Sequence, residues 1–336
     1  MAVAANSRRV VQLLWLAAGL LFALALLHSI GNPEKAKAWA TDKVGNIING
    51  DGGRVPMREF MAIAEASWAK TVKQRHDLIK ADFGGDATKV PLFPATDAGT
   101  YGRTPYTVWD FVPASYGCPH EMERVGRMGD GGKWVCGMSK YVNFPHDRDC
   151  VVYSFGVRDE SSFEEEMLSR TKCSVWAYDF SVVDFGKQLE PQHRSKAHFL
   201  QAGIAGKTDP ARDPPFYSIA DLMKKNGHDY IDILKMDIEF AEFEAMDGFG
   251  EDFPLSLGEE LPIGQLMIEI HFFNGMTVDR FLDWWERLES RGLRPAWTEP
   301  NLLAVTINLA NKDPILAEYT MINVHDSRSV LFGGRK

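Results

Sequence analysis

The sequence predicts an α/β protein with a mainly parallel, doubly wound sheet, preceded by one transmembrane helix and an amphipathic stem helix. Three observations lead to this prediction. Short apolar runs alternate with helical segments from Val151 to Val324, and small or ionisable residues stand where these runs end. A long apolar segment, residues 10–30, lies near the N-terminus. Alternating strands and helices are typical of a parallel sheet covered by helices on both faces.

The N-terminal segment is the one part of the chain that is apolar enough to enter a membrane. Residues 10–30 contain only three polar side chains, and a helix of this length spans a bilayer core. We expect residues 1–9 to be a short tail and residues 10–30 a signal anchor in the lipid bilayer. Long domains translocate largely regardless of their charge, so we expect a single-pass type II protein with a lumenal domain in the Golgi or ER. A cleaved signal peptide is the alternative.

Residues 31–108 read as a tether followed by a helical stem. The apolar side chains between residues 57 and 81 recur close to helical spacing and predict an amphipathic helix that packs on the core. These side chains are Phe60, Ile63, Trp68, Val72 and Ile79. The whole chain has 336 residues, 45% of them hydrophobic, and a net charge of −9. This acidic balance argues against nucleic acid as the main partner.

The segment from Cys150 to Asp179 predicts a βαβ unit. An apolar run, residues 151–155, stops at Gly156, and a second run, residues 174–178, stops at Asp179. Runs rich in Val and aromatic residues read as buried strands, and the polar segment between them reads as a helix. A Gly that ends one strand and an acid that ends the next, about 20 residues later, are typical of a Rossmann-like site for a nucleotide-type ligand.

The nature of that ligand follows from charge and from the missing glycines. A dinucleotide site needs G-x-G-x-x-G, and only Gly156 is present. The next helix carries Glu164, Glu165 and Glu166, which we expect to repel a pyrophosphate. S-Adenosylmethionine carries a sulfonium, an ammonium and one carboxylate, and its net positive charge tolerates these acids. The sequence therefore favours this methyl donor over NAD, with a buried βαβ unit that binds no ligand as the remaining alternative.

Four cysteines lie within residues 118–173, and their even number favours an oxidising compartment. Cys150 and Cys173 each stand five residues before matching points of two neighbouring strands. Neighbouring strands are about 4.8 Å apart, which is within the Cα distance of a disulfide. We therefore predict a Cys150–Cys173 disulfide and, by elimination, a Cys118–Cys136 disulfide.

The remaining chain continues the alternating pattern. We expect strands at 198–204, 230–239, 266–271, 293–297 and 319–324, and helices at 218–226, 241–246 and 278–291, whereas residues 302–309 have no clear pattern. Residues 126–133, G-R-M-G-D-G-G-K, fail the spacing of a phosphate loop. Turn chemistry explains them, and a lid with Asp130 or Lys133 pointing into the site is the alternative.

Small or ionisable side chains follow five predicted strands, where ligands bind in sheets of this kind. They are Gly156, Asp179, Gly203 with Ile204, Asp237 with Glu239, and Glu269 with His271. Each has a structural alternative, since Asp237 can cap the next helix and His271 can be a hydrogen-bonded core residue.

The segment Y-I-D-I-L-K-M-D-I-E-F-A-E, residues 230–242, resembles the I-D-x-L-K-x-D-x-E-G-A-E signature of FkbM-type methyltransferases. Phe240 replaces the Gly of that signature, so the turn here is expected to differ. G-D-G-G-K-W-V-C and Y-S-F-G look more similar to the membrane-anchored group typified by methyltransferase-like protein 24. The likeness covers most of residues 109–336, which we take as a methyltransferase-like domain.

The resemblance implies a Rossmann-like fold that binds S-adenosylmethionine. It places Gly156 at the methionine end and Asp179 on the ribose, with Phe180 and Ile204 beside the adenine and Gly203 next to them. FkbM-type enzymes usually methylate sugar or other hydroxyls, which implies a small-molecule or glycan acceptor. Loss of the hydroxyl proton needs a base.

For that base we expect His271, with Glu269 or Asp237 nearby. No ligand spacing in the sequence demands a metal, although Asp237, Glu239 and Glu269 are able to hold one. Two other hypotheses remain: a methyltransferase fold without activity that serves as a membrane-tethered binding module, and a nicotinamide-dependent enzyme, which the missing glycines disfavour.

Overall fold

A computed structural model describes residues 56–94, 106–145, 147–273, 275–307 and 313–332. The predicted tail and signal anchor, residues 1–30, lie outside these ranges. Within them, no helix combines the length and the apolar character that crossing a membrane requires. The described residues from Met57 onward cluster as one compact unit.

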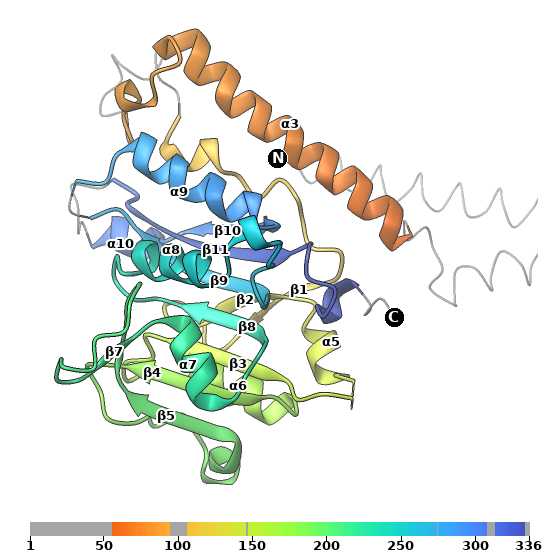
Figure 1. The fold of residues 1–336 in the computed structure, drawn as a ribbon, viewed down its shortest axis with the longest axis vertical. Helices are drawn as coiled ribbons and strands as arrows, with labels where there is room; N and C mark the ends of the chain where they lie inside the picture. Colours follow the sequence, from red (N-terminus) through yellow and green to blue (C-terminus); the bar gives the residue numbers. More distant parts are fainter. Residues whose placement is uncertain (1–55, 95–105, 146, 274, 308–312, 333–336) are drawn as a thin grey trace, which may run out of the picture. The chain divides into compact units, whose positions relative to one another are not determined.

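A seven-stranded sheet forms the centre of this unit, in the order β10-β11-β9-β8-β3-β4-β5 (Figure 1). The strands are β3 (Val151–Phe155), β4 (Ser174–Asp179), β5 (Ala197–Gln201), β8 (Ile231–Met236), β9 (Ile263–His271), β10 (Leu293–Pro300) and β11 (Leu316–Asn323). Strand β11 runs antiparallel to β9 and β10, and the pairings among β9, β8, β3, β4 and β5 are parallel. The prediction of a mainly parallel α/β sheet is confirmed.

Two hydrophobic cores lie on the two faces of the sheet. Tyr153 and Phe155 of β3 belong to one core and Val152 to the other, because successive side chains of a strand point to opposite faces. The first core includes side chains of α7 (Ile219–Asn226), α8 (Glu242–Asp252) and α9 (Val278–Ser290). The second includes side chains of α5 (Met138–Val142), α6 (Ser162–Arg170) and a hairpin of β1 (Met122–Val125) and β2 (Lys133–Cys136). The sheet is therefore covered on both faces, as expected.

Helix α3 (Met57–Phe83) is the predicted stem helix, and both apolar and polar contacts attach it to the sheet domain. Arg75 Nη2 lies 2.6 Å from Glu289 Oε2 of α9. Arg294 of β10 pairs with Glu65 at 2.8 Å, and its guanidinium lies 3.6 Å from the centre of the Trp68 ring. Ile63 was expected on the packing face but is 59% exposed. This expectation is wrong for Ile63, but the predicted packing on the core is confirmed: Ile79 is part of one hydrophobic core, and Phe60 and Trp68 pack against the other.

Three segments differ from the expected elements. Residues 126–132 join β1 and β2 as the turn of an antiparallel hairpin, and Lys133 begins β2, although no strand was expected before residue 126. The strand expected at 198–204 breaks after β5, and β6 (Gly203–Ile204) pairs instead with β7 (Phe216–Tyr217). The unassigned residues after 301 begin helix α10 (Leu302–Thr306). Short 3₁₀ helices are η1 (Ala87–Lys89), η2 (Val108–Phe111), η3 (Pro191–Lys196), η4 (Leu255–Leu257) and η5 (Val330–Phe332).

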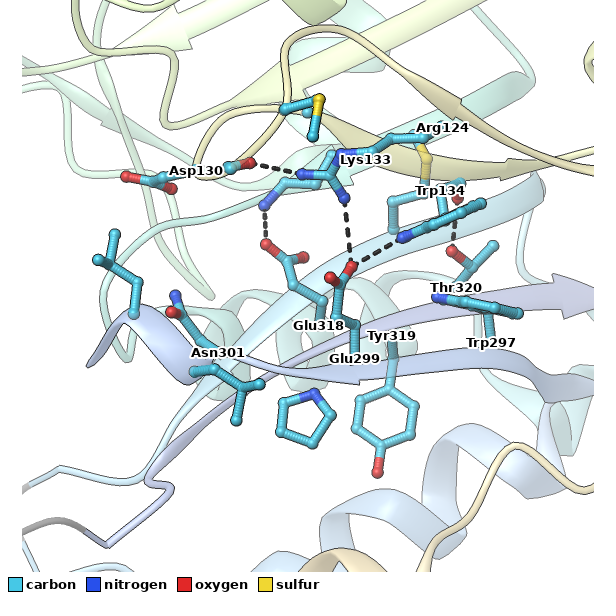
Figure 2. A pocket seen from close by; sticks show the side chains of 17 residues that line it. Arg124, Asp130, Lys133, Trp134, Trp297, Glu299, Asn301, Glu318, Tyr319 and Thr320 are labelled. Atoms are coloured by element: carbon cyan, nitrogen blue, oxygen red, sulfur yellow. Dashed lines mark hydrogen bonds and ion pairs between the residues drawn. The ribbon is translucent and has the colours of Figure 1, made fainter. Parts of the chain in front are cut away.

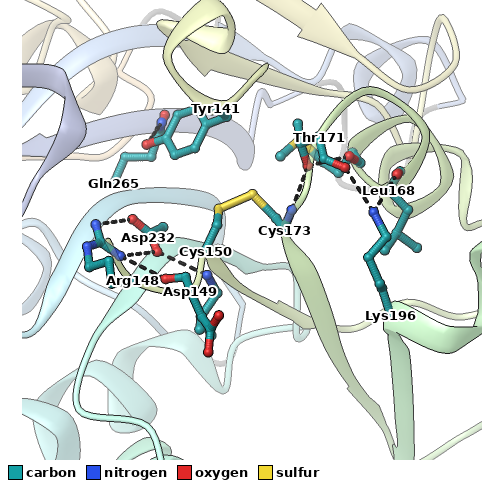
Figure 3. Close-up of a disulfide and its surroundings, with 12 residues drawn as sticks. Tyr141, Arg148, Asp149, Cys150, Leu168, Thr171, Cys173, Lys196, Asp232 and Gln265 are labelled. Atoms are coloured by element: carbon teal, nitrogen blue, oxygen red, sulfur yellow. Dashed lines mark hydrogen bonds and ion pairs between the residues drawn. A yellow bond between two sulfur atoms is a disulfide. The ribbon is translucent and has the colours of Figure 1, made fainter. Parts of the chain in front are cut away.

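Both predicted disulfides are confirmed. Cys150 and Cys173 precede β3 and β4, whose register pairs Val151 with Ser174, and their Cα atoms are 4.4 Å apart (Figure 3). Cys118 and Cys136 are bonded with a Cα distance of 5.7 Å. The first bridge therefore fastens the start of the βαβ unit, and the second fastens β2 to the segment before β1.

Candidate functional site

The candidate site lies where β3 and β8 end. Strand β3 is flanked by β4 on one side and β8 on the other, so the chain leaves it in opposite directions along the sheet. Ligands of doubly wound sheets bind at the carboxyl ends of the strands beside such a switch point. Gly156 follows β3 and Asp237 follows β8, which puts both predicted residues at this point.

Gly156 is required by the backbone at the switch point. Its φ is 74°, and a Cβ atom here would lie 1.7 Å from the carbonyl oxygen of Asp237. The buried ammonium of Lys235 lies 3.4 Å from the Gly156 carbonyl oxygen, to which it donates. Lys235 also pairs with Glu164 at 3.3 Å. The sequence analysis did not select Lys235, although it lies two residues before Asp237 in the quoted signature.

The three glutamates of α6 do not act as predicted. Buried Glu164 is neutralised by Lys235, Glu165 lies 2.7 Å from His193 Nδ1, and Glu166 lies 2.6 Å from Arg170. None of the three lines the cavity described below. These glutamates are therefore bonded to protein side chains away from the cavity, and they give no support to the argument that they would repel a pyrophosphate.

A cavity of about 200 Å³ lies beside Gly156, at the carboxyl ends of β3, β4 and β8. All five residues expected to bind the cofactor line it: Gly156, Asp179, Phe180, Gly203 and Ile204. The cavity also contains Arg158, Ser181 and Phe216, which sequence analysis missed. Phe216 escaped notice because β7 is only two residues long and follows a loop. We call this space the donor cavity.

Asp179 and Phe216 define the two ends of the donor cavity. Asp179 Oδ2 accepts from the backbone N–H of Arg158 at 2.8 Å, and Oδ1 accepts from the backbone N–H and the hydroxyl of Ser181. The Phe216 ring lies 5.7 Å from the Phe180 ring, and a Cβ at Gly203 would lie 2.3 Å from it. A fixed carboxylate beside an aromatic wall matches a ribose next to an adenine.

A polar cluster borders the donor cavity and contains the three expected catalytic residues. His271 Nε2 lies 3.9 Å from Asp237 Oδ1 and 3.7 Å from Glu269 Oε2. Glu269 and His271 are two apart in β9, so their side chains share one face, as predicted. His271 Nδ1 donates to Glu242 Oε1 at 3.0 Å, which fixes the orientation of the ring. Glu242, the last residue of the quoted signature, was not selected.

Burial and charge set the protonation of this cluster. Burial alone would lower the pKa of His271, but the hydrogen bond to Glu242 and the nearby carboxylates outweigh it and raise the pKa to about 9. Burial and repulsion from Asp237 and Glu318 raise the pKa of Glu269 to about 8. For Asp237, the charges of Lys133, Lys235 and His271 outweigh burial and lower the pKa to about 2. At neutral pH, Asp237 is thus an ionised carboxylate, and the His271 ring is protonated and positively charged.

A second cavity, of about 490 Å³, is lined in part by Lys133 (Figure 2). Its lining includes Trp134, Trp297, Glu299, Asn301 and Glu318. The two Trp rings lie 4.6 Å apart, and Trp134 Nε1 donates to Glu299 Oε2 at 2.7 Å. We call this space the acceptor cavity.

Lys133 joins the two cavities. It is 2% exposed, and its ammonium lies 3.2 Å from Asp237 Oδ2, at the donor cavity, while it also donates to Glu318 of the acceptor cavity. Neighbouring Glu318 and Asp237 outweigh the burial of this ammonium and raise its pKa, so it stays charged. Asp130 lines the acceptor cavity as well. Of the two interpretations of residues 126–133, the turn is observed, and Lys133 at its end points into the site.

The fold, the switch-point cavity and the strand-end acids together define a methyltransferase, and comparison with protein families agrees. The model of a methyltransferase-domain family matches residues 88–298, more than half of the chain. The chain therefore belongs to this methyltransferase-domain family. The expected class, an S-adenosylmethionine-dependent methyltransferase, is confirmed. The lining of the donor cavity has the chemistry that this cofactor needs, with a carboxylate at Asp179 and apolar or aromatic side chains at Phe180, Ile204 and Phe216.

Among individual proteins, the chain is similar to the human protein named "Probable methyltransferase-like protein 24". The two are 28% identical over 149 residues, which cover 41% of this chain and 38% of that protein. The match thus extends over well under half the length of this relative.

Solved structures show more distant likeness. A putative S-adenosylmethionine-dependent methyltransferase from Streptococcus mutans has a TM-score of 0.33 and 12% identity, with 60% of this chain and 55% of that chain covered. The 1,6-didemethyltoxoflavin-N1-methyltransferase of Burkholderia thailandensis, solved with S-adenosylhomocysteine, has a TM-score of 0.29 and 13% identity, with 52% and 71% covered.

Proposed function

We propose that this chain methylates a hydroxyl group of a sugar or glycan acceptor bound in the acceptor cavity. The observation that carries the proposal is the position of Lys133, whose ammonium contacts Asp237 of the donor cavity and Glu318 of the acceptor cavity. An acceptor molecule in the acceptor cavity that reaches Lys133 is close to the Asp237 carboxylate, which lines the donor cavity. This adjacency is what an in-line displacement requires.

S-Adenosylmethionine supplies an electrophilic methyl group on its sulfonium, and the sulfur leaves as a neutral thioether. The protein must then position the hydroxyl oxygen and take its proton. Asp237 lines the donor cavity, and Glu269 and His271 lie beside Asp237, so we assign the activation of the acceptor hydroxyl to this cluster. Lys133 stays charged and holds the Asp237 carboxylate at the junction.

The lining of the acceptor cavity favours a carbohydrate. Sugar rings present apolar C–H faces that pack on aromatic rings, and hydroxyls that bond to carboxylates and amides. Trp134 and Trp297 supply the rings, and Glu299, Asn301 and Asp130 supply the polar groups. The resemblance of residues 230–242 to FkbM-type enzymes supports a hydroxyl acceptor as well.

Turnover on a panel of oligosaccharides tests this proposal. The purified chain and S-adenosylmethionine should give S-adenosylhomocysteine together with an acceptor that gains one methyl group. Trp134→Ala should raise KM for that acceptor roughly tenfold, since a stacked aromatic contact and its buried area contribute about 1–2 kcal/mol. Trp134→Phe should restore most of this loss because it keeps a ring.

Two results would contradict the proposal. One is methylation of a nitrogen or of a protein side chain instead of a hydroxyl. The other is a chain that binds the donor but turns over no member of the panel, which would favour the binding-module hypothesis.

We propose further that the domain is lumenal and is anchored through residues 10–30. Support comes from the apolar character of those residues and from the two disulfides, which persist in oxidising compartments. Four free thiols in unreduced peptides of the cell-made protein would contradict this placement.

A further inference from the structure

Asp237, Glu269 and His271 offer one ligand atom each, and these atoms all lie within 4.8 Å of one another. They belong to the ends of two neighbouring strands, β8 and β9, at the junction of the donor and acceptor cavities. We propose that this group binds a divalent transition-metal cation, with His271 Nε2, Asp237 Oδ1 and Glu269 Oε2 as the protein ligands.

His271 has the setting of a metal-binding histidine. Its side chain is only 2% exposed, and Glu242 accepts from Nδ1 at 3.0 Å. The other ring nitrogen, Nε2, points at carboxylate oxygens 3.7–3.9 Å away and has no hydrogen bond among the described residues. Metal-binding histidines nearly always donate their second ring N–H to a carboxylate, carbonyl or water. A ring nitrogen of a buried histidine that faces three carboxylates and makes no hydrogen bond is what a bound cation would satisfy.

The two carboxylates are oriented in the same way. Asn301 Nδ2 donates to Glu269 Oε1 at 2.8 Å, and Lys133 donates to Asp237 Oδ2 at 3.2 Å. In both acids the second oxygen faces His271 and has no hydrogen bond among the described residues. Each of the three ligands is thus held through one atom and presents its other atom to a common centre.

The local charge also calls for a cation. Lys235 is paired with Glu164, and Lys133 is shared between Glu318 and Asp237. Four carboxyl groups lie 3.0–3.9 Å from the ring nitrogens of His271, and among the described residues only Asp237 of these four pairs with a lysine. These acids are Asp237, Glu239, Glu242 and Glu269. Glu239 reaches the cluster from a backbone position with φ of 55°, which is unusual for a residue with a side chain.

The ligand set indicates the kind of cation. Imidazole suits zinc, iron, nickel and copper, and carboxylates suit manganese, magnesium and calcium. A site with one imidazole and two carboxylates can bind either Mn²⁺ or Zn²⁺. This cation's role rests on the proposed function: it would bind the acceptor hydroxyl and lower its pKa, as metals do for water. The hydroxyl proton then passes to water, and the three residues act as ligands.

Manganese titration of the purified chain, without donor or acceptor, tests the inference. The six-line electron paramagnetic resonance signal of free Mn²⁺ should disappear as one ion binds per chain. His271→Ala and the isosteric Asp237→Asn should each weaken binding by roughly 10- to 100-fold or more, the loss seen when supporting contacts of metal ligands are removed. Circular dichroism shows whether each variant is folded, and Asp237→Asn keeps the test valid if His271→Ala is not.

A matched control comes from the other group of similar composition, Glu165, Glu190 and His193. There the His193 ring nitrogen is already bonded to Glu165, at 2.7 Å, and Glu190 is exposed. His193→Ala should therefore leave Mn²⁺ binding unchanged.

The inference is overturned if wild-type protein binds neither Mn²⁺ nor Zn²⁺ below about 1 mM, a weak affinity by protein standards. It is also overturned if binding survives in folded Asp237→Asn, or is lost in His193→Ala instead. Metal binding without any methyl transfer contradicts only the proposed function. Methyl transfer by protein that binds no metal contradicts only this inference.

Discussion

Single residues at the switch point are fixed by backbone contacts as much as by the ligand. Gly156 is needed because the Asp237 carbonyl occupies the place of a Cβ atom. Asp179 accepts three hydrogen bonds from Arg158 and Ser181, so its carboxylate is oriented before any ligand binds. The same residues therefore shape both the fold and the donor cavity.

Phe240 shows a local conflict between sequence and backbone. It stands where the FkbM-type signature has Gly, and its φ of 81° is a conformation that favours Gly. Phe240 thus occupies a backbone conformation that Gly prefers. The centre of the Phe240 ring lies 5.2 Å from the centre of the Phe243 ring, and this packing favours a side chain at position 240.

Because of this backbone conformation, we expect Gly to be more stable than Ala at position 240, the reverse of the usual order. Ala is usually favoured over Gly by about 0.5–1 kcal/mol in regular structure, but a left-handed backbone costs residues other than Gly about 1–2 kcal/mol. We expect Phe240→Gly to be more stable than Phe240→Ala by roughly 1 kcal/mol in urea unfolding.

The control is the same pair of substitutions at Phe243, which lies inside helix α8 and should show the ordinary order. Equal or lower stability of Phe240→Gly relative to Phe240→Ala would show that the turn relaxes in the variants and carries no strain.

The sequence predicted the positions of the site residues better than it predicted their contacts. Small or ionisable residues at strand ends marked Gly156, Asp179, Asp237 and His271, because the pattern is local. Lys133 meets Asp237 across 104 positions of the chain, and no local pattern encodes such a contact. The pairing of Glu164 with Lys235 and of Glu165 with His193 could not be predicted for the same reason.

Elements with a strong period were predictable, and short irregular ones were not. Helix α7 has its Ser218 cap and its left-handed Gly227 where the sequence indicated them. The β1–β2 hairpin was missed because both strands have only four residues, and turn signals dominate between them. Strand β11 could be found, but its antiparallel direction depends on partners that the sequence does not reveal.

The βαβ unit should depend on its disulfide for stability. The Cys150–Cys173 bridge closes a segment of 23 residues, and loop-closure entropy predicts a contribution of roughly 3 kcal/mol. Cys150→Ser/Cys173→Ser should lose about this amount in chemical unfolding under non-reducing conditions.

The Cys118→Ser/Cys136→Ser variant is the comparison, since its segment of 18 residues predicts a similar loss. An unchanged unfolding midpoint in the Cys150→Ser/Cys173→Ser variant would show that other contacts already hold β3 and β4 together.

For the whole molecule, the arrangement of two cavities around one polar cluster connects fold to function. The donor cavity follows from the switch point of the sheet, and the acceptor cavity is formed by β2, β10, β11 and α10. Parallel strands could be expected to gather the donor residues at one edge. The acceptor cavity could not be expected, because its aromatic residues come from segments 163 positions apart, Trp134 and Trp297.

The central claim is that S-adenosylmethionine binds beside Gly156 with its ribose on Asp179, and calorimetric titration tests it most directly. We predict one donor molecule per chain and no heat with NAD. Hydrogen bonds to a carboxylate are worth roughly 1.5–3 kcal/mol, so Asp179→Ala should weaken binding about 10- to 150-fold. Ser181→Ala, which removes one hydroxyl that Asp179 accepts from, should change the affinity far less. Unchanged affinity in folded Asp179→Ala, or binding of NAD in place of the methyl donor, would contradict the account.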